Sequence, residues 1–217
     1  MDVKIPWQAW YDESEITLDF PDSWRVTVAP MRDAPPVGEG AIQQALRHPI
    51  GTPPLAELSR ASEKAVIVVE DITRPLRTAE ILPVILAELA NGGIKPPNVW
   101  IAIGQGAHTP MNRADLIRKL GRPIVEKYTV HQNLPYEHRE YLGKTERGTP
   151  VFISRFYLDA DLRISLGTLT PHAYAGFGGG AKTVAVDMAG IETLAVNHGR
   201  AYTTQDVSTA KVDDNDC

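Results

Sequence analysis

Apolar runs separated by helical patterns organise the chain. Residues 65–69 and 99–103 are rich in apolar and β-branched side chains, which is typical of strands buried on both faces of a sheet. Residues 162–166 are interpreted as a third buried strand. Residues 78–91 carry apolar side chains at helical spacing, and glycines 92 and 93 would end that helix. The alternation predicts an α/β fold, Rossmann-like, with a largely parallel sheet flanked by helices.

Weaker patterns predict the shorter elements. Residues 16–20 and 24–29 alternate apolar and polar side chains, which predicts two strands joined by a turn at Asp22 and Ser23. Helical spacing predicts helices over three further segments, 39–48, 55–60 and 112–120. Shorter strands are expected at 128–131 and 151–154.

Composition excludes several classes of protein. The chain has 217 residues and a net charge of −5, with acidic and basic side chains interspersed, so no electrostatic footprint for nucleic acid or an anionic membrane is present. No apolar run reaches the roughly 20 residues that span a bilayer. The single cysteine, Cys217, allows no internal disulfide, and we expect a cytoplasmic protein. We expect residues 1–200 to form one α/β domain, with 201–217 as a linker or the start of a truncated second domain.

Polar side chains follow each of the three buried strands. Because ligands bind at the carboxyl ends of strands in open α/β sheets, these side chains predict an active site on one rim. The residues at these strand ends are Asp71, Thr73 and Arg74, then Gln105, His108 and Thr109, then Thr168, Thr170 and His172.

These groups allow more than one chemistry. His108 and His172 could exchange protons with opposite faces of one substrate, or they could ligate a metal. Arg74 could hold a carboxylate or a phosphate. Residues 176–183 nearly match a phosphate-binding loop, with Ala181 where its second glycine should be, so a phosphate- or nucleotide-binding module is the alternative function. His198 alone is typical of a helix end, where the dipole favours a cation.

Taken in order, the motifs resemble those of the nickel-dependent lactate racemase family. The resemblance covers most of the chain. It runs through residues 71–75, 104–110 and 165–167, then His172 to Lys182, and ends at Asn197 and His198. It implies the N-terminal domain of a two-domain α/β protein whose active site lies between the domains.

The resemblance also implies a cofactor and residue roles. The cofactor would be a nickel-pincer nucleotide, a nicotinic-acid-derived group tethered to Lys182, with His198 as the protein ligand of nickel. His108 and His172 would be the acid/base pair, and Asp71 and Arg74 would bind substrate. The remaining cofactor-binding residues would be Thr73, Gly176, Gly178, Gly179 and Gly180.

The implied reaction is racemisation or epimerisation of a lactate-like 2-hydroxy acid, by transient hydride transfer to the pincer ring. The implied partners are the cofactor maturation proteins and the missing second domain, without which the chain is expected to be inactive. A family member that binds a hydroxy acid without catalysis is a further alternative. The sequence departs from the family at Gly178, where a serine is expected, and at Val186 and Asp187, where the family usually has Pro-Gly.

Overall fold

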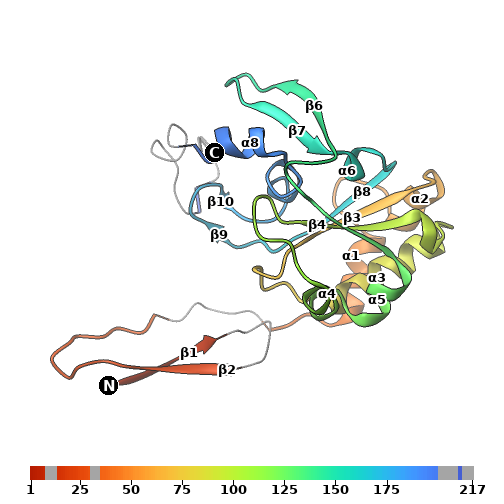
Figure 1. Cartoon of the computed structure of the whole chain (residues 1–217). Coiled ribbons are helices and arrows are strands. Elements are labelled where there is room, and N and C mark those ends of the chain that lie inside the picture. The colour runs from red at the N-terminus through yellow and green to blue at the C-terminus, as the bar shows by residue number, and fades with distance from the viewer. Residues whose placement is uncertain (8–13, 30–34, 200–209, 212–217) are drawn as a thin grey trace.

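A four-stranded parallel sheet forms the centre of the computed structural model, which describes residues 1–7, 14–29, 35–199 and 210–211 (Figure 1). The strand order is β5-β4-β3-β8. The strands are β3 (Ala65–Glu70), β4 (Val99–Gly104), β5 (Thr129–Gln132) and β8 (Leu162–Leu166). The order runs outward from β3 to β5 and then returns to the other side of β3. The sheet therefore has a topological switch point between β3 and β8, the place where such folds bind ligands.

Helices cover both faces of this sheet. One face is covered by α1 (Glu39–Arg47), α2 (Leu55–Arg60), α3 (Thr78–Asn91), α4 (Arg113–Leu120) and α5 (Arg122–Lys127), and a short 3-10 helix (Pro96–Asn98) precedes β4. The short helices α6 (Arg155–Leu158) and α7 (Lys182–Ala185) contact β3 from the other face. The α/β class and the parallel sheet flanked by helices are thus confirmed.

The residues of β3 divide between two hydrophobic clusters. Ala65, Ile67 and Val69 pack with the α1–α5 face, whereas Val66 and Val68 pack with Ala102, Ala160 and Met188 on the other side. These five side chains of β3 are all fully buried. Because successive side chains of a strand point to opposite faces, a strand covered on both sides must be apolar at every position. This explains the uninterrupted apolar run.

The outer elements are hairpins and a helix. β1 (Asp2–Trp7) pairs with β2 (Ser14–Asp19), β6 (Arg139–Lys144) with β7 (Pro150–Ser154), and β9 (Pro171–His172) with β10 (Gly176–Phe177). Helix α8 (Ile191–Asn197) packs on β7. Among the described residues, none of the helices has the length and apolar character needed to cross a bilayer.

Of two expectations for residues 16–29, the first strand and its turn are confirmed and the second strand is wrong. The turn at Asp22 and Ser23 is present, and β2 lies close to its predicted position. Residues 24–29 form no strand, since no neighbouring strand of the described chain pairs with them. The sequence analysis did not predict β1, β6, β9, β10, α5, α6 or α8. The predicted boundary at residue 200 falls among residues outside the described part of the chain.

Candidate active site

The predicted rim brings three loops together at the carboxyl ends of β3, β4 and β8. Glu70, the last residue of β3, is buried, and its Oε2 accepts hydrogen bonds from the backbone N–H of Thr168 at 3.0 Å and from its hydroxyl at 2.8 Å. The loop after β8 is therefore fixed to the end of β3. This contact lies at the switch point of the sheet.

Asp71 and His108 form a carboxylate–imidazole pair across two of these loops. Asp71 is only 3% exposed, and its Oδ2 lies 2.6 Å from His108 Nδ1. The other carboxylate oxygen accepts from both the backbone N–H and the hydroxyl of Thr73. An ionised carboxylate only accepts hydrogen bonds, so in the neutral tautomer that fits this contact His108 would carry its proton on Nδ1 and present Nε2 as an acceptor. The imidazole is 48% exposed, within reach of a ligand.

The hydrogen bonds of His172 favour the opposite ring tautomer. Its Nδ1 accepts hydrogen bonds from the backbone N–H groups of Tyr174 and Ala175, both at 3.2 Å. Burial lowers the pKa of His172, and electrostatic interactions with Lys182, Arg74 and, least of the three, His198 lower it further, against the attraction of Asp187. The ring is therefore neutral at pH 7, and a neutral ring that accepts at Nδ1 carries its proton at Nε2. One histidine presents an acceptor and the other a donor.

Lys182 lies in a buried ion pair. Its Nζ is 2.8 Å from Asp187 Oδ1, and the two side chains are 9% and 10% exposed. The backbone around Asp187 is fixed independently, because Asn133 Nδ2 donates to the carbonyls of Asp187 and Ala189, and Gly106 N–H donates to the Asp187 carbonyl. The carboxylate is thus held at the amine by the loop after β4 and by the end of β5.

His198 is a further titratable residue that interacts electrostatically with Lys182. It follows α8, and partial burial and the Lys182 charge lower its pKa, with His108 adding a smaller effect in the same direction. A neutral imidazole is the form that binds a metal. Within the described ranges no three or more His, Cys, Asp or Glu side chains group to hold a metal ion.

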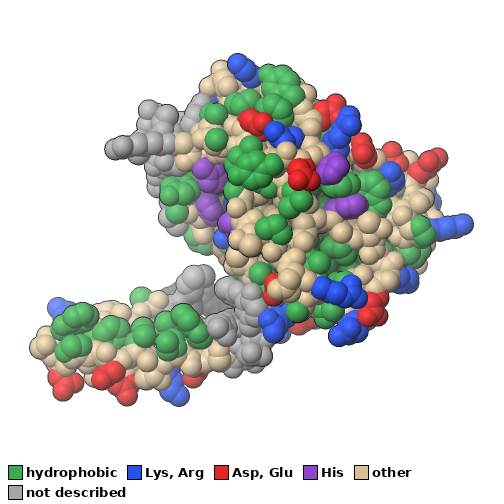
Figure 2. Space-filling model, in the orientation of Figure 1, with side chains coloured by type: hydrophobic (Ala, Val, Ile, Leu, Met, Phe, Trp, Pro, Cys, Tyr) green, Lys and Arg blue, Asp and Glu red, His purple; other side chains and the backbone are tan. Residues whose placement is uncertain are grey.

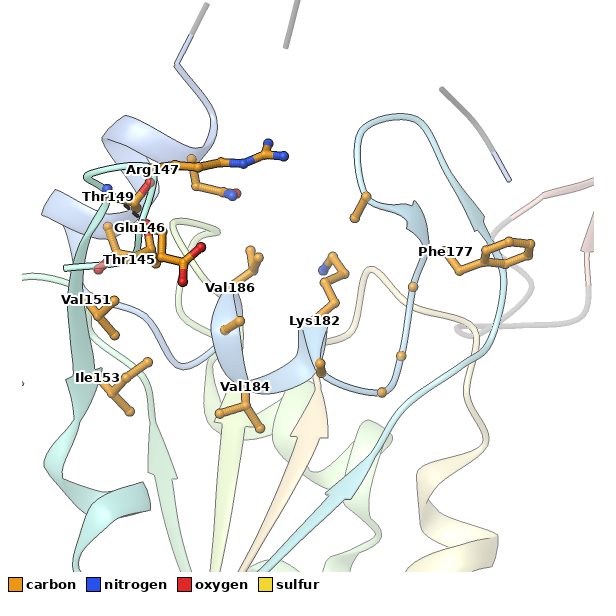
Figure 3. A pocket seen from close by; sticks show the side chains of 18 of the residues that line it. Thr145, Glu146, Arg147, Thr149, Val151, Ile153, Phe177, Lys182, Val184 and Val186 are labelled. Atoms are coloured by element: carbon orange, nitrogen blue, oxygen red, sulfur yellow. Dashed lines mark hydrogen bonds between the residues drawn. The ribbon is translucent and has the colours of Figure 1, made fainter. Parts of the chain in front are cut away.

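A cavity of about 1100 Å³ lies beside Lys182 (Figure 3). One wall is Gly178, Gly179, Gly180 and Lys182, and the floor includes Val184 and Val186. The opposite wall is the β6–β7 hairpin, from which Arg147 projects across the opening in Figure 3. Such a volume accommodates a mononucleotide-sized group. The predicted residues His108, His172, His198, Asp71 and Arg74 do not line this cavity, although Lys182, which does, acts electrostatically on His172 and His198.

The glycine cluster is folded back on the chain. A side chain at Gly179, which has a φ of +73°, would meet the Thr168 carbonyl at 3.0 Å, and one at Gly178 would meet it at 3.3 Å. The helix that follows, α7, has only four residues. This compact turn differs from an open loop before a long helix, so it disfavours the phosphate-loop interpretation.

Gly167 has no room for a side chain. A Cβ there would lie 2.8 Å from Thr183 Oγ1 and 3.1 Å from Gly179 Cα. We expect Gly167→Ala to lower the free energy of unfolding by about 1–3 kcal/mol, because the glycine cluster must move. Urea unfolding measures this, and Gly40→Ala in α1, where nothing lies within 4 Å, is the matched control. Equal stability of the two variants would contradict the close packing.

A buried lysine fixes the Arg74 loop from below. Lys119 of α4 is 6% exposed, and its Nζ donates to the carbonyls of Arg74 at 2.9 Å and of Leu76 at 3.2 Å. Burial lowers the pKa of Lys119 to about 8, against the attraction of Glu70 and Asp71. Lys119 therefore positions the backbone that carries the Arg74 guanidinium.

Replacing Lys119 by Met is expected to abolish a rise in stability between about pH 8 and pH 10.5. Below pH 8 the folded and unfolded chains both hold the proton, and burial of the ammonium costs its full amount. Above pH 8 the folded chain releases the proton first, so the free energy of unfolding increases, on the order of 1–3 kcal/mol over this window. Urea unfolding at several pH values checks this, with exposed Lys95→Met as control. The same rise in Lys119→Met would refute the assignment.

Sequence reasoning gave no structural role to three residues that build the site. Lys119, Asn133 and Asp187 contact backbone or charged groups of the site, yet none belongs to a motif that signals chemistry. For Asp187 a signal existed, since it stands where the resembled family usually has glycine. For Asp71 the geometry favours a residue that orients His108, because both carboxylate oxygens already have partners.

Comparisons with known proteins identify the family of the chain. The family model described as the lactate racemase N-terminal domain matches residues 11–210. A lactate racemase from Thermoanaerobacterium thermosaccharolyticum is 29% identical over 210 residues, which are 90% of this chain and 46% of that protein. A lactate racemase from Lactiplantibacillus plantarum is 32% identical over 164 residues, 74% of this chain and 38% of that protein.

Solved structures give the same fold. The lactate racemase apoprotein from T. thermosaccharolyticum superposes with a TM-score of 0.81 at 27% identity, covering 99% of this chain and 50% of that one. A protein from Thermotoga maritima superposes with a TM-score of 0.66 at 19% identity over 86% of this chain and 47% of its own, which shows the fold alone. This chain spans about half the length of these relatives, or less.

Proposed function

Since this chain belongs to the lactate racemase N-terminal domain family, we propose that its site interconverts the enantiomers of a lactate-like 2-hydroxy acid. The observation that carries the proposal is the pair of histidines held in opposite states. His108 presents a proton acceptor backed by Asp71, and His172 presents a proton donor. Interconversion of two enantiomers by transient oxidation needs an acid/base group for each enantiomer, and here one imidazole follows β4 and the other lies in the β9–β10 hairpin.

The residues fit the cofactor that the resemblance implies. A neutral His198 offers one metal ligand, and the organic group of the implied cofactor would contribute the others. Lys182 lies on the wall of a cavity large enough for a mononucleotide. We infer that Lys182 and His198 hold a nickel-pincer nucleotide, with Thr73 and the glycines of the cluster beside it. When bound, this group would supply a two-electron acceptor next to C2 of the substrate.

The protein residues account for binding and proton transfer. Arg74 offers a guanidinium that grips the substrate carboxylate bidentately, and Lys119 fixes its backbone. His108 takes the hydroxyl proton at Nε2, and the buried Asp71 carboxylate stabilises the imidazolium that forms. His172 donates from its Nε2 on the other side. For the opposite enantiomer the roles exchange, which requires His172 to move its proton to Nδ1 or release it.

The decisive experiment is intact mass with nickel analysis after co-expression with the cofactor maturation proteins. The chain is analysed alone and joined to the second half of the T. thermosaccharolyticum relative, with Lys182→Ala as control. We expect an added mass that disappears in Lys182→Ala, with about one nickel per chain. If both forms lack the added mass and lack nickel, the cofactor assignment is refuted. Saturable nucleotide binding lost in Lys182→Ala would instead establish the phosphate-binding module.

A further inference from the structure

Glu70 is a buried carboxylate that the proposed mechanism does not use. It is 3% exposed and ends β3, in which the five preceding residues are all apolar. Burying a carboxylate is costly unless hydrogen bonds and a nearby cation replace the lost water. An apolar side chain would continue the strand without this cost. The presence of Glu70 at this position therefore calls for a role beyond packing.

The hydrogen bonds of Glu70 come from a loop that is distant in sequence. Its Oε2 accepts from the backbone N–H of Thr168 at 3.0 Å and from the Thr168 hydroxyl at 2.8 Å. The same loop packs on the other carboxylate oxygen, because a Cβ at Gly167 would lie 3.3 Å from Oε1. Lys119 adds an electrostatic attraction. The carboxylate thus holds a residue that lies two positions beyond the end of β8.

The segment that Glu70 holds supports the hairpin that carries His172. The Gly178 N–H donates to the Thr170 carbonyl at 2.7 Å. A Cβ at Gly179 would meet the Thr168 carbonyl at 3.0 Å, so the glycine cluster packs directly on this segment. His172 follows shortly afterwards in β9, which pairs with β10. Movement of Thr168 would therefore move both strands of the hairpin.

The other histidine is held by the next residue of the chain. Asp71, directly after Glu70, lies 2.6 Å from His108 Nδ1. Figure 2 shows histidine side chains on the surface of the molecule. His108 is among the exposed residues, whereas Glu70 and Asp71 are both buried. Two consecutive buried carboxylates at the end of β3 therefore contact the two loops that lead to the histidines.

We propose that Glu70 is a positioning residue that sets the separation of His172 from His108. Thr168 connects the end of β3 to the hairpin of His172, and Asp71 fixes His108 from the same point of the backbone. β3 is an inner strand covered on both faces, so it gives the two loops a rigid common reference. The catalytic meaning of this separation rests on the proposed function, in which both imidazoles serve one substrate.

A distance measurement by electron paramagnetic resonance tests the proposal on the 217-residue chain. Cys217→Ser removes the only thiol, and nitroxide labels are attached at Thr109→Cys and Ala173→Cys, which are exposed positions next to the two histidines. This labelled background should give one narrow distribution of distances. Glu70→Leu keeps the bulk of the side chain but accepts no hydrogen bond, so it should lose the narrow maximum.

Three further variants identify the contact that matters. Glu70→Gln keeps an oxygen that accepts from Thr168, so it should retain the narrow distribution. Thr168→Val lacks the hydroxyl but keeps the N–H, and its distribution should lie between those of the background and Glu70→Leu. Glu88→Leu is the matched control, because it removes another buried carboxylate, one that pairs with Arg47 away from the site. It should leave the distribution unchanged.

A native distribution in Glu70→Leu, or the same broadening in Glu88→Leu, would overturn the proposal. Should Glu70→Leu fail to fold, a native distribution in Thr168→Val would overturn it instead. In the matured form joined to the second half, Glu70→Leu should lower kcat by about 10²-fold, since a misplacement of about 1 Å has an effect of that size, and Glu70→Gln should restore it. Absence of racemisation in the native joined form would count against the proposed function and leave the measured distances standing.

Discussion

Replacing Asp71 by Asn is expected to lower the turnover of a 2-hydroxy acid by about 10²- to 10⁴-fold. One carboxylate oxygen of Asp71 accepts two hydrogen bonds from Thr73, so the amide oxygen of the asparagine must take that place. The amide N–H₂ then faces His108 Nδ1, which has to become an acceptor. The ring proton moves to Nε2, and His108 can no longer take a proton from the substrate.

The tautomer and the rate are measured separately. Nitrogen-15 NMR of the histidine rings in the 217-residue chain should report Nδ1–H for the native His108 and Nε2–H for Asp71→Asn. Racemisation is assayed in the form joined to the second half and co-expressed with the maturation proteins. Asp115→Asn, at the capping box of α4, makes the same chemical change away from the site. An unchanged His108 tautomer in Asp71→Asn would contradict the mechanism, whatever the rate.

The central sheet was predictable because burial on both faces leaves a clear signal. Val66, Ile67 and Val68 are apolar without interruption only because both sides of β3 are covered. Recognising these buried strands also fixes where they end. Because the carboxyl ends of parallel strands lie at one edge of the sheet, the convergence of Asp71, His108 and the loop after β8 could be predicted from topology. The resemblance supplied Lys182 and His198, which spacing alone left ambiguous.

The contacts between distant segments were not predictable. Lys119 reads as a surface lysine of an amphipathic helix, and only the fold places its amine under the Arg74 loop. From the sequence Asn133 is likewise indistinguishable from any loop residue. Only the fold brings the carbonyls of Asp187 and Ala189 to its side-chain amide. The strand expected at 24–29 shows the opposite failure. Its alternation is real, but a strand requires a neighbour, and the described chain offers none.

The ion pair between Lys182 and Asp187 predicts a second large effect, on the reactivity of the amine. In the native chain the ammonium is held at 2.8 Å by a buried carboxylate. Asp187→Gly, which restores the residue usual in the family, would leave the charge buried without a partner. The amine would no longer be held by its hydrogen bond to the carboxylate. We expect acylation of Lys182 at pH 8 to become about 10- to 100-fold faster, since a hydrogen bond to a charged group is worth about 1.5–3 kcal/mol.

Acetylation by an N-hydroxysuccinimide ester, followed by peptide mass spectrometry, measures this on the chain as it stands. The exposed Lys95 gives the intrinsic rate in the same sample, and Asp187→Asn retains a hydrogen-bond acceptor while removing the charge. Asn should therefore fall between the native chain and Asp187→Gly. Equal labelling of Lys182 in all three chains would show that Asp187 does not control the amine. The proposed tether depends on a neutral amine, so a lysine restrained by Asp187 would accept its cofactor only once that ion pair is broken.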